Sequence, residues 1–291
     1  MAGTLATGVA TLIFSLTGVN FENSIVRPNG NLLLTTINNG SLYEIDPSSA
    51  SPAAHLTATF GGANVLGISS IGSDKYAIAG GFSSGGGGGG GPGGYSNGTI
   101  FTIDLSTNST LPLLGSPAAT IPDSQLLDGL TALPAQPHVL LVTDALQGLV
   151  YRVDTATGAA EVAAQDDAFA GSPGVNGIKI LDGHAYFTNT ATKTYGRFAI
   201  SDDGLQAGAV EIIAEDASSD DFALGPGGMA YLGRQQSPAA VVRILPDGTK
   251  EDIATSAAMG RPCSLDLALD GKTGYVTTAS GQVFEFDVPE I

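Results

Sequence analysis

Apolar and polar residues alternate along short segments of this chain, and the same arrangement of segments recurs from one end to the other. Residues 175–201 form one copy, in which apolar runs at 178–180, 185–188 and 195–200 are separated by turns such as Asp182-Gly183. Alternation over a few residues is typical of half-buried strands, and an Asp-Gly pair is typical of a tight hairpin. The pattern therefore predicts a series of antiparallel strands.

The repeat is clearest in the third strand of each copy. Six segments align there: SLYEID, TIFTID, LVYRVD, YGRFAIS, AVVRIL and QVFEFD. The residue that opens the first strand also recurs, at intervals of about 43 to 62 residues: Glu22, Leu66, Asp128, Asn176, Asp220 and Cys263. About four strands in a period of roughly 40–50 residues indicate a propeller blade. We therefore expect an all-β, six-bladed β-propeller.

The two ends of the chain complement each other in this scheme. The last copy holds only three strands before Ile291, and the apolar segment Val9–Leu16 precedes the first copy. We expect this N-terminal strand to complete the last blade and close the ring, because closure removes exposed strand edges. Since the repeat leaves no boundary, we expect a single domain over residues 1–291.

The second interval is longer than the others because it holds a glycine-rich insertion at about residues 81–98. Its seven consecutive glycines, Gly85–Gly91, predict a flexible surface loop. A phosphate-binding P-loop would need a Lys and a following helix, and this segment has neither.

The net charge of the chain limits the kinds of molecule that it can bind. The 291 residues carry a formal net charge of −17, with 41 Gly and a single cysteine. This balance argues against nucleic acid and against anionic membrane surfaces, because both require clusters of Lys and Arg. The first apolar segment is too short and interrupted to span a membrane. A cytoplasmic location and secretion after loss of a signal peptide both stay open, as does the oligomeric state.

The recurrent positions predict a functional site. In a propeller the innermost strands surround the axis, so the residues that open them face one another at one axial mouth. Four of these are polar: Glu22, Asp128, Asn176 and Asp220. Three carboxyl groups and an amide on one ring are costly unless they are solvated, protonated or bound to a cation. Such oxygen ligands suit Ca²⁺, Mg²⁺ or Mn²⁺, whereas capping of strand ends and binding of water is the structural alternative.

Other candidates lie close to these positions in the repeat. The ends of second strands add Asp144, Asn189 and Arg234, and Tyr195 is expected on a loop above the mouth. We expect Asp144 and Tyr195 to bind substrate, together with two further ring positions and the neighbours of the ring: Leu66, Cys263, Phe21, Asn23, Asp221 and Phe222. Asn189 and Arg234 are catalytic candidates.

The familiar nucleophile arrangements lack a base. His55 falls in a predicted outer strand, and His138 and His184 fall at turns that begin second strands. None is expected near the mouth, which argues against Ser-His-Asp and Cys-His catalysis. Cys263 is expected to be a small buried residue.

Three segments carry a resemblance to a known family: ENSIVRPNGNLLLTT, NGIKILDGHAYFTNT and DDFALGPGGMAYLG. They resemble the fungal branch of the SMP-30/gluconolactonase/LRE-like six-bladed propellers, and the similarity covers the whole chain. The wider family includes lactonases and esterases that use a divalent metal. By this resemblance the metal ligands are Glu22, Asn176 and Asp220, although Asp221 and Phe222 replace the family's usual glycine and the residue after it.

The resemblance implies a reaction as well. Members of the fungal branch resemble natural-product enzymes, among them hetero-Diels–Alderases that join a quinone methide to an alkene. Our first hypothesis is a cyclisation of a small hydrophobic metabolite, with hydrogen bonds to a carbonyl from Asp128, Asn176, Asn189 or Arg234. This reading requires no cofactor.

Two other functions stay open. The second hypothesis is a lactonase in which Glu22, Asn176 and Asp220 hold a cation such as Ca²⁺, and Asp128 or Asp144 acts as base. The third is a propeller that only binds a ligand or a protein.

Overall fold

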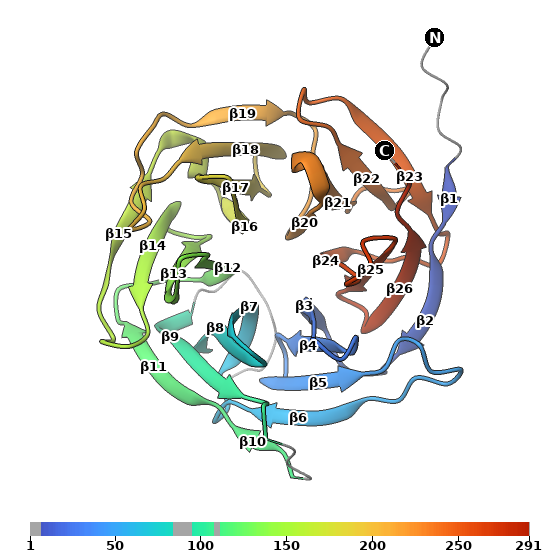
Figure 1. Ribbon diagram of the computed structural model, residues 1–291, viewed down its shortest axis with the longest axis horizontal. Coiled ribbons are helices and arrows are strands. Elements are labelled where there is room, and N and C mark those ends of the chain that lie inside the picture. Colours follow the sequence, from blue (N-terminus) through green and yellow to red (C-terminus); the bar gives the residue numbers. More distant parts are fainter. Residues whose placement is uncertain (1–6, 84–94, 108–110, 291) are drawn as a thin grey trace.

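The computed structural model describes residues 7–83, 95–107 and 111–290. Six sheets surround one axis as blades, with β3, β7, β12, β16, β20 and β24 innermost (Figure 1). Two 3₁₀ turns, η1 (Asp167–Phe169) and η2 (Pro226–Gly228), are the helical segments among the described residues. The described residues form no helix that is long and apolar enough to cross a membrane. The all-β, six-bladed propeller expected from the repeat is confirmed.

The first three blades are given from the innermost strand outward. Blade one consists of β3 (Phe21–Val26), β4 (Leu32–Thr36), β5 (Ser41–Ile45) and β6 (His55–Thr59), with β10 (Leu113–Leu114) outside β6. Blade two consists of β7 (Asn64–Gly72), β8 (Lys75–Ser83), β9 (Tyr95–Asp104) and β11 (Ser116–Ile121). Blade three consists of β12 (Leu127–Leu133), β13 (Gln136–Asp144), β14 (Leu149–Asp154) and β15 (Ala160–Gln165). The expected loop at Gly85–Gly91 lies outside the described residues.

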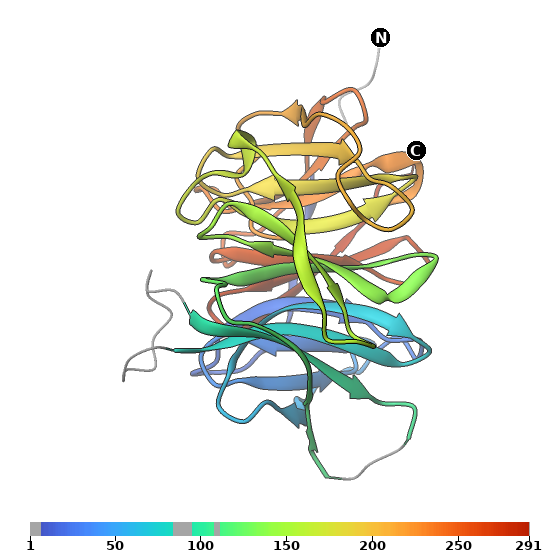
Figure 2. The same ribbon diagram turned by 90° about the vertical axis from the view of Figure 1, so that its left-hand side faces the viewer.

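The other three blades follow the same plan. Blade four consists of β16 (Val175–Leu181), β17 (His184–Asn189), β18 (Thr194–Ala199) and β19 (Glu211–Ala214). Blade five consists of β20 (Phe222–Leu224), β21 (Ala230–Arg234), β22 (Ala240–Ile244) and β23 (Lys250–Thr255). Blade six contains β24 (Pro262–Leu267), β25 (Thr273–Thr278) and β26 (Gln282–Asp287). Figure 2 shows the ring from its side, with the turns between strands at its two faces.

The N-terminal segment pairs with the outer strands of two blades. β2 (Thr11–Ser15) lies antiparallel to β26 as the fourth strand of blade six, with Thr11 opposite Glu285. β1 (Gly8–Val9) instead lies parallel to β23 as the outermost strand of blade five. The buried Ala10 separates the two strands, and its N–H donates to the carbonyl of Thr255. The single strand expected at Val9–Leu16 is therefore divided at Ala10.

A bulge recurs near the start of the inner strands. In blades one to four, two consecutive residues of the inner strand lie opposite one residue of the second strand. The first of each pair is a recurrent position of the sequence: Glu22, Leu66, Asp128 and Asn176. A bulge leaves an extra residue outside the ladder and bends the strand, so the carbonyls of these residues need partners elsewhere.

Threonine side chains of the second strands supply such partners at several positions of the ring. Thr35 opposes the bulge of blade one, accepts a hydrogen bond from Asn23 N and donates to the carbonyl of Leu66 in blade two at 2.6 Å. Thr188 does the same between blades four and five, from Gly177 N to the carbonyl of Asp220. Thr143 donates to the carbonyl of Asn176. Each threonine therefore links the bulge of one blade to the next blade.

Glycines allow the bulges of neighbouring blades to approach. A Cβ added at Gly67 would collide with the carbonyl of Asp128, and one at Gly129 would collide with the carbonyl of Asn176. Apolar clusters fill the remaining space between the sheets; Phe169, for example, packs edge-on against Phe187 with ring centroids 5.0 Å apart. The inner ends of the strands are thus held in fixed positions around the axis.

Removal of residues 1–15 tests the role of the N-terminal segment. The truncation deletes β1 and β2, so it exposes the edge of β26 and the cluster around Phe284. We expect the melting temperature to fall by more than about 10 °C, since several kcal/mol are lost and each shifts Tm by roughly 2–4 °C in a chain of this size. Removal of residues 1–6, which leaves both pairings intact, is the control. An unchanged Tm after the longer truncation would contradict the prediction.

Thr188→Val tests the link between blades. Valine has nearly the same shape but leaves the N–H of Gly177 and the carbonyl of Asp220 without this partner. The N–H of Gly177 also donates to the carbonyl of Asp220 at 3.3 Å, so the two groups keep each other as partners. We expect a loss of about 1–3 kcal/mol in the free energy of unfolding in urea, because two hydrogen bonds of roughly 0.5–1.5 kcal/mol each are removed. Thr273→Val, at the start of β25, should change stability by less than about 0.5 kcal/mol. Equal losses in the two variants would rule out a special role for Thr188.

Candidate functional site

The recurrent residues meet at one end of the axis. Glu22 and Asp128 lie on bulges of β3 and β12, and Asp220 lies just before β20. One carboxylate oxygen each of Glu22 and Asp220 and the sulfur of Cys263 lie within 4.8 Å of one another. The side chain of Asn176 is joined to this group because its Nδ2 donates to Asp220 Oδ1 at 2.6 Å. We call Glu22, Asp128, Asn176, Asp220 and Cys263 the mouth cluster.

Asp220 has polar partners on three sides. Besides Asn176, Gln235 Nε2 donates to its Oδ2 at 3.1 Å, and the guanidinium of Arg261 lies 3.7 Å from the same oxygen. Burial and the neighbouring Asp221 still raise the pKa of Asp220 to about 6, while Arg261 and the two amides lower it. The Arg261 side chain is 61% exposed, so it can also reach a molecule above the mouth.

Glu22 and Asp128 differ from Asp220 in their hydrogen bonds. No hydrogen bond to either side-chain carboxyl occurs within the described part of the chain, although the residues are only 7% and 5% exposed. Burial, reinforced by repulsion from Asp220, raises the pKa of both carboxyl groups well above the ordinary range. A buried carboxyl group with a raised pKa keeps its proton to higher pH than a solvated one, and the protonated form can donate a hydrogen bond. The cost of burying these two carboxyl groups is therefore relieved only by protonation or by contact with water, a cation or a ligand.

A second polar layer follows the mouth cluster along the chain. Asp221 accepts hydrogen bonds from Lys179 Nζ on both oxygens and from Asn23 Nδ2 at 2.7 Å. Ser264 Oγ in turn donates to Asn23 Oδ1. The chain of bonds crosses blades four, five, one and six. The side chains of Asn23 and Asp221, which we expected to bind substrate, are used in these hydrogen bonds. We therefore assign both residues to the support of the mouth cluster.

The residues at the ends of second strands hold loops. Asp144 accepts hydrogen bonds from the backbone N–H groups of residues 125, 126, 146 and 147. Asn189 donates to the carbonyls of Ala168 and Ala170. Arg234 turns outward and forms a bidentate ion pair with Asp252 on β23. Their polar atoms are engaged, and we assign Asp144, Asn189 and Arg234 to loop and strand anchoring rather than to catalysis or substrate contact.

The apolar candidates are core residues. Phe21, Leu66, Phe222 and Tyr195 are each at most 1% exposed. Tyr195 lies on β18 rather than on a loop above the mouth, and its ring packs edge-on against Phe222 with centroids 5.4 Å apart. With so little exposed surface, these side chains cannot touch a molecule at the mouth in this arrangement.

Histidine is not part of this cluster. His55 lies on the outer strand β6. His138 and His184 lie near the starts of β13 and β17, and the mouth cluster is at the other ends of these strands. Cys263 is 2% exposed, and burial, reinforced by the charges of Glu22 and Asp220, raises the pKa of its thiol well above the ordinary value. A thiol held in its protonated form is a poor nucleophile. The site lacks the base and the thiolate that Cys-His catalysis requires.

The donor atoms of the mouth cluster fit a divalent cation. Glu22 and Asp220 offer hard oxygen ligands, and the charge of a cation would relieve the repulsion that raises the pKa values of the carboxyl groups. Asn176 is adjacent, as the expected set of ligands requires. Cys263 adds a soft donor that this set did not include. A bound cation would polarise a carbonyl group or lower the pKa of a water molecule.

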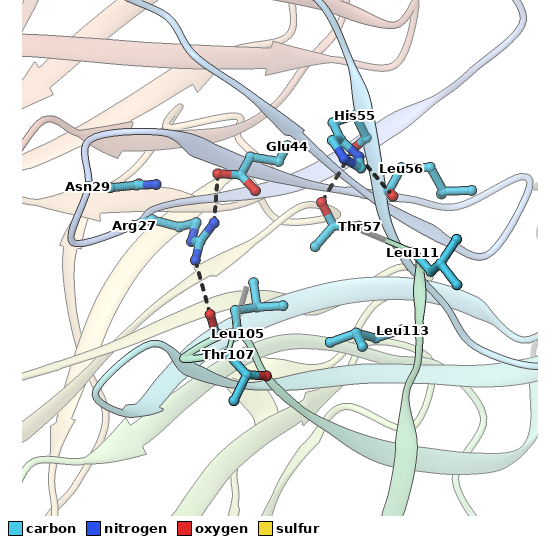
Figure 3. A pocket seen from close by; sticks show the side chains of 10 residues that line it. All are labelled: Arg27, Asn29, Glu44, His55, Leu56, Thr57, Leu105, Thr107, Leu111 and Leu113. Atoms are coloured by element: carbon cyan, nitrogen blue, oxygen red, sulfur yellow. Dashed lines mark hydrogen bonds and ion pairs between the residues drawn. The ribbon is translucent and has the colours of Figure 1, made fainter. Parts of the chain in front are cut away.

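A cavity of about 310 Å³ lies between blades one and two and is lined by Arg27, Glu44, His55 and Leu113 among others (Figure 3). Arg27 follows the end of β3 opposite to Glu22. Its guanidinium binds Glu44, Asp74 and the carbonyl of Leu105, so its charge is balanced within the protein. This cavity is remote from the mouth cluster.

Sequence reasoning missed four residues of the site: Lys179, Gln235, Arg261 and Ser264. Arg261 and Ser264 flank the recurrent Cys263, and Gln235 follows the end of a second strand, so proximity to the repeat was a usable signal for these three. Lys179 gave no signal, because its position in the alternating β16 segment is that of an ordinary solvent-facing residue.

Comparisons with known proteins agree with the resemblance carried by the quoted segments. No protein-family model matches the sequence. A protein from Phoma sp. with the provisional name of a hetero-Diels–Alderase is 29% identical over 239 residues, which cover 72% of this chain and 67% of that protein. A Sarocladium schorii protein with the same provisional name is 27% identical over 237 residues, or 71% of this chain. The match spans only 58% of the length of that second relative.

Solved structures show the same architecture. The calcium-binding protein regucalcin from Agrobacterium tumefaciens superposes with a TM-score of 0.70 at 16% identity, over 98% of this chain and 95% of its own. A gluconolactonase from Xanthomonas campestris superposes with a TM-score of 0.69 at 13% identity, over 96% and 89% of the two chains. The predicted relatives, fungal proteins named as hetero-Diels–Alderases and propellers of the gluconolactonase and regucalcin kind, are confirmed. At these identities the structural neighbours establish the fold alone.

Glu22→Gln tests the electrostatics of the mouth cluster. Below about pH 4 the carboxyl group is neutral in the folded and unfolded states; as pH rises, the unfolded state ionises near 4.5 while burial opposes ionisation in the fold. Wild type therefore loses stability as pH rises from the unfolded pKa to the higher folded pKa, and the neutral glutamine avoids this loss. In EDTA we expect the variant to match wild type at pH 4 and to exceed it at pH 8, by a few degrees in melting temperature.

Glu285→Gln on β26 is the matched control and should show no such difference between pH 4 and pH 8. If Glu22→Gln were less stable than wild type at pH 8, the Glu22 carboxylate would have a stabilising partner, and the assignment of a costly buried charge would be wrong.

Proposed function

We propose that this chain, a six-bladed β-propeller similar in sequence to fungal proteins named as hetero-Diels–Alderases, is an enzyme of natural-product biosynthesis. Its substrate is a small hydrophobic metabolite with a conjugated carbonyl group, and the reaction is a cyclisation or cycloaddition over the axial mouth. The observation that carries the proposal is the pair of nearly buried carboxyl groups, Glu22 and Asp128, without a hydrogen-bond partner in the described residues.

The chemistry follows from the protonation state of these groups. A neutral carboxyl group of Glu22 or Asp128 donates a hydrogen bond to the carbonyl oxygen of the heterodiene. Negative charge grows on that oxygen as the alkene adds, so the hydrogen bond is stronger in the transition state than in the ground state. Arg261 lies beside Asp220 with an exposed guanidinium and supplies positive charge near the same oxygen.

Such a cycloaddition needs no nucleophile and no leaving group. Two π bonds of the reactants become two σ bonds of the new ring, and the bonding changes within the reactants alone. Holding the two reacting parts in a near-attack geometry lowers the activation barrier further. This suits a cluster in which Cys263 is protonated and the histidines lie elsewhere.

One observation favours a second function, hydrolysis of a lactone or another ester. The ligand atoms of Glu22, Asp220 and Cys263 gather within 4.8 Å, as at a cation site. In that reading Glu22, Asn176 and Asp220 hold a divalent cation that polarises the lactone carbonyl, and the nearby Asp128 accepts a proton from water. A propeller that binds a ligand or protein without chemistry is the third possibility.

Alanine substitutions at the mouth separate these functions. Two reactions are assayed with purified protein: addition of an o-quinone methide generated in situ to a vinyl ether, and hydrolysis of gluconolactone. We expect catalysis of the first, with Glu22→Ala and Asp128→Ala each lowering kcat by about 10- to 100-fold, in the range for loss of one hydrogen-bond donor to a developing oxyanion. Glu285→Ala is the control and should retain full activity.

Removal of metal ions with EDTA also separates the cycloaddition from the lactonase function. Turnover of the cycloaddition should survive EDTA, whereas a lactonase would lose activity in EDTA and regain it with Ca²⁺. Calorimetric titration with CaCl₂ measures the cation site without reference to any reaction, and Glu22→Ala should abolish whatever binding it detects. Absence of both reactions, in wild type and with Ca²⁺ present, would leave ligand binding as the function.

A further inference from the structure

Three residues of the mouth cluster bring together donor atoms of two different kinds. Glu22 on β3, Cys263 on β24 and Asp220 just before β20 belong to three consecutive blades around the axis (Figure 1). One carboxylate oxygen of each acid and the sulfur of Cys263 lie within 4.8 Å of one another. Carboxylates are hard ligands and sulfur is a soft one, so this group differs chemically from a site made of oxygen atoms alone.

The carboxyl group of Glu22 is available to a ligand. Glu22 is only 7% exposed, and its side chain forms no hydrogen bond with any described residue. Its oxygens are nevertheless not enclosed as the unpaired hydroxyl groups of Ser24 and Tyr195 are, so a small ion can reach them from the mouth. A nearly buried carboxyl group without a partner is costly, and a cation in contact with it removes that cost.

The other two side chains also keep binding capacity. Asp220 Oδ1 accepts one hydrogen bond, from Asn176, and a carboxylate oxygen has lone pairs for two partners. The thiol of Cys263 makes one weak contact, with its sulfur 3.7 Å from the carbonyl oxygen of Arg261. Coordination of a cation would therefore break no strong interaction of either side chain.

The residues that follow the three donor residues are hydrogen-bonded to one another. They are Asn23, Asp221 and Ser264. Asn23 Nδ2 donates to Asp221 Oδ2 at 2.7 Å, and Ser264 Oγ donates to Asn23 Oδ1 at 2.9 Å. The backbone N–H of Asp221 also donates to the carbonyl of Cys263 at 2.8 Å. These bonds hold the backbones of the donor residues together, and such support is what orients the ligands of a metal site.

We propose that Cys263 makes the mouth cluster a site for a thiophilic divalent cation, bound by Glu22, Asp220 and the Cys263 sulfur, with Zn²⁺ preferred to Ca²⁺. On binding, the ion displaces the thiol proton to solvent, and the resulting thiolate favours Zn²⁺. Three protein ligands leave the fourth position of a tetrahedral zinc ion for water or another oxygen.

The charges of such a site balance within the protein. Two carboxylates and a thiolate exceed the charge of a divalent ion by a single negative charge. The guanidinium of Arg261, 3.7 Å from Asp220 Oδ2, supplies the compensating positive charge. The proposal goes beyond the two reactions described above, because neither of them uses the thiol of Cys263.

Cobalt absorption tests the sulfur ligand directly. Cys263 is the single cysteine of the chain, so a thiolate-to-cobalt charge-transfer band in the near ultraviolet can arise only from this residue. The full chain is freed of metal with EDTA, transferred to chelator-free buffer at neutral pH and titrated with Co²⁺ as a spectroscopic substitute for Zn²⁺. We expect the band to saturate at one ion per chain, to disappear when Zn²⁺ is added and to persist in excess Ca²⁺.

Calorimetric titrations with ZnCl₂ and CaCl₂ measure the contribution of each ligand. We expect Cys263→Ser to weaken Zn²⁺ binding by about tenfold or more and to change any Ca²⁺ binding by less than about twofold, because only Zn²⁺ gains from a sulfur ligand. Glu22→Gln should weaken the binding of both ions by about tenfold or more, since it removes a charged oxygen ligand. Glu285→Gln, outside the mouth cluster, is the matched control and should leave both affinities unchanged. Melting temperatures verify that each variant folds.

Three results would overturn the proposal. They are the absence of a charge-transfer band in wild type at saturating Co²⁺, equal Zn²⁺ affinities in wild type and Cys263→Ser, and an unchanged Co²⁺ affinity in Glu22→Gln. The last result would mean that the thiol binds the ion without the carboxylates of the cluster. None of these measurements involves turnover, so they test the cation site whatever reaction takes place at the mouth.

Discussion

The hydrogen bond from a second-strand threonine to the bulge of the next blade is the interaction on which this propeller depends. Thr35 and Thr143 donate to the bulge carbonyls of Leu66 and Asn176 in the following blade, and Thr188 donates to the carbonyl of Asp220 just before β20. Thr277 lies 3.5 Å from the carbonyl of Glu22 and makes the corresponding contact from blade six to blade one. The bulge would otherwise leave these buried carbonyls unpaired. The same bond therefore pairs a carbonyl that the bulge leaves outside the ladder and joins two neighbouring blades.

The electrostatics of the mouth are a consequence of this arrangement. Threonines of neighbouring blades hold the backbones of Glu22 and Asp220, and Gly67 packs against the carbonyl of Asp128. The side chains of these three residues therefore have little freedom to move apart. Glu22, Asp128 and Asp220 consequently remain close together and nearly buried, and burial with mutual repulsion raises their pKa values. A fold that merely needed to close its ring would be served by small or apolar residues at these positions, as at Leu66.

The residue after each recurrent position divides the ring into two halves. In blades two to four it is Gly67, Gly129 or Gly177, and the next backbone packs directly against the glycine. In blades five, six and one it is Asp221, Ser264 or Asn23, and these side chains bond to one another and to Lys179. The polar half lies beside Asp220 and Glu22. It gives the carboxyl groups of the mouth a rigid, charged support that an all-glycine ring would lack.

The periodic part of the structure was predictable from the sequence alone. Alternation in segments such as SLYEID and QVFEFD, repeated six times, determines the number of blades and the inner position of Glu22, Asp128, Asn176 and Asp220. Strand period and repeat length are local properties, so they can be read without knowledge of packing. The resemblance in three segments likewise identified the right relatives.

The direction and partners of individual side chains were decided only by the tertiary structure. Repeat position placed Asp144, Asn189 and Arg234 near the mouth, but their partners, which are loop N–H groups, loop carbonyls and Asp252, come from contacts that no local pattern encodes. Tyr195 and Phe222 are buried because blades four and five meet over them. Lys179 joins the site through Asp221, 42 residues away in the chain. Such contacts depend on how twisted sheets pack against each other, which periodicity does not specify.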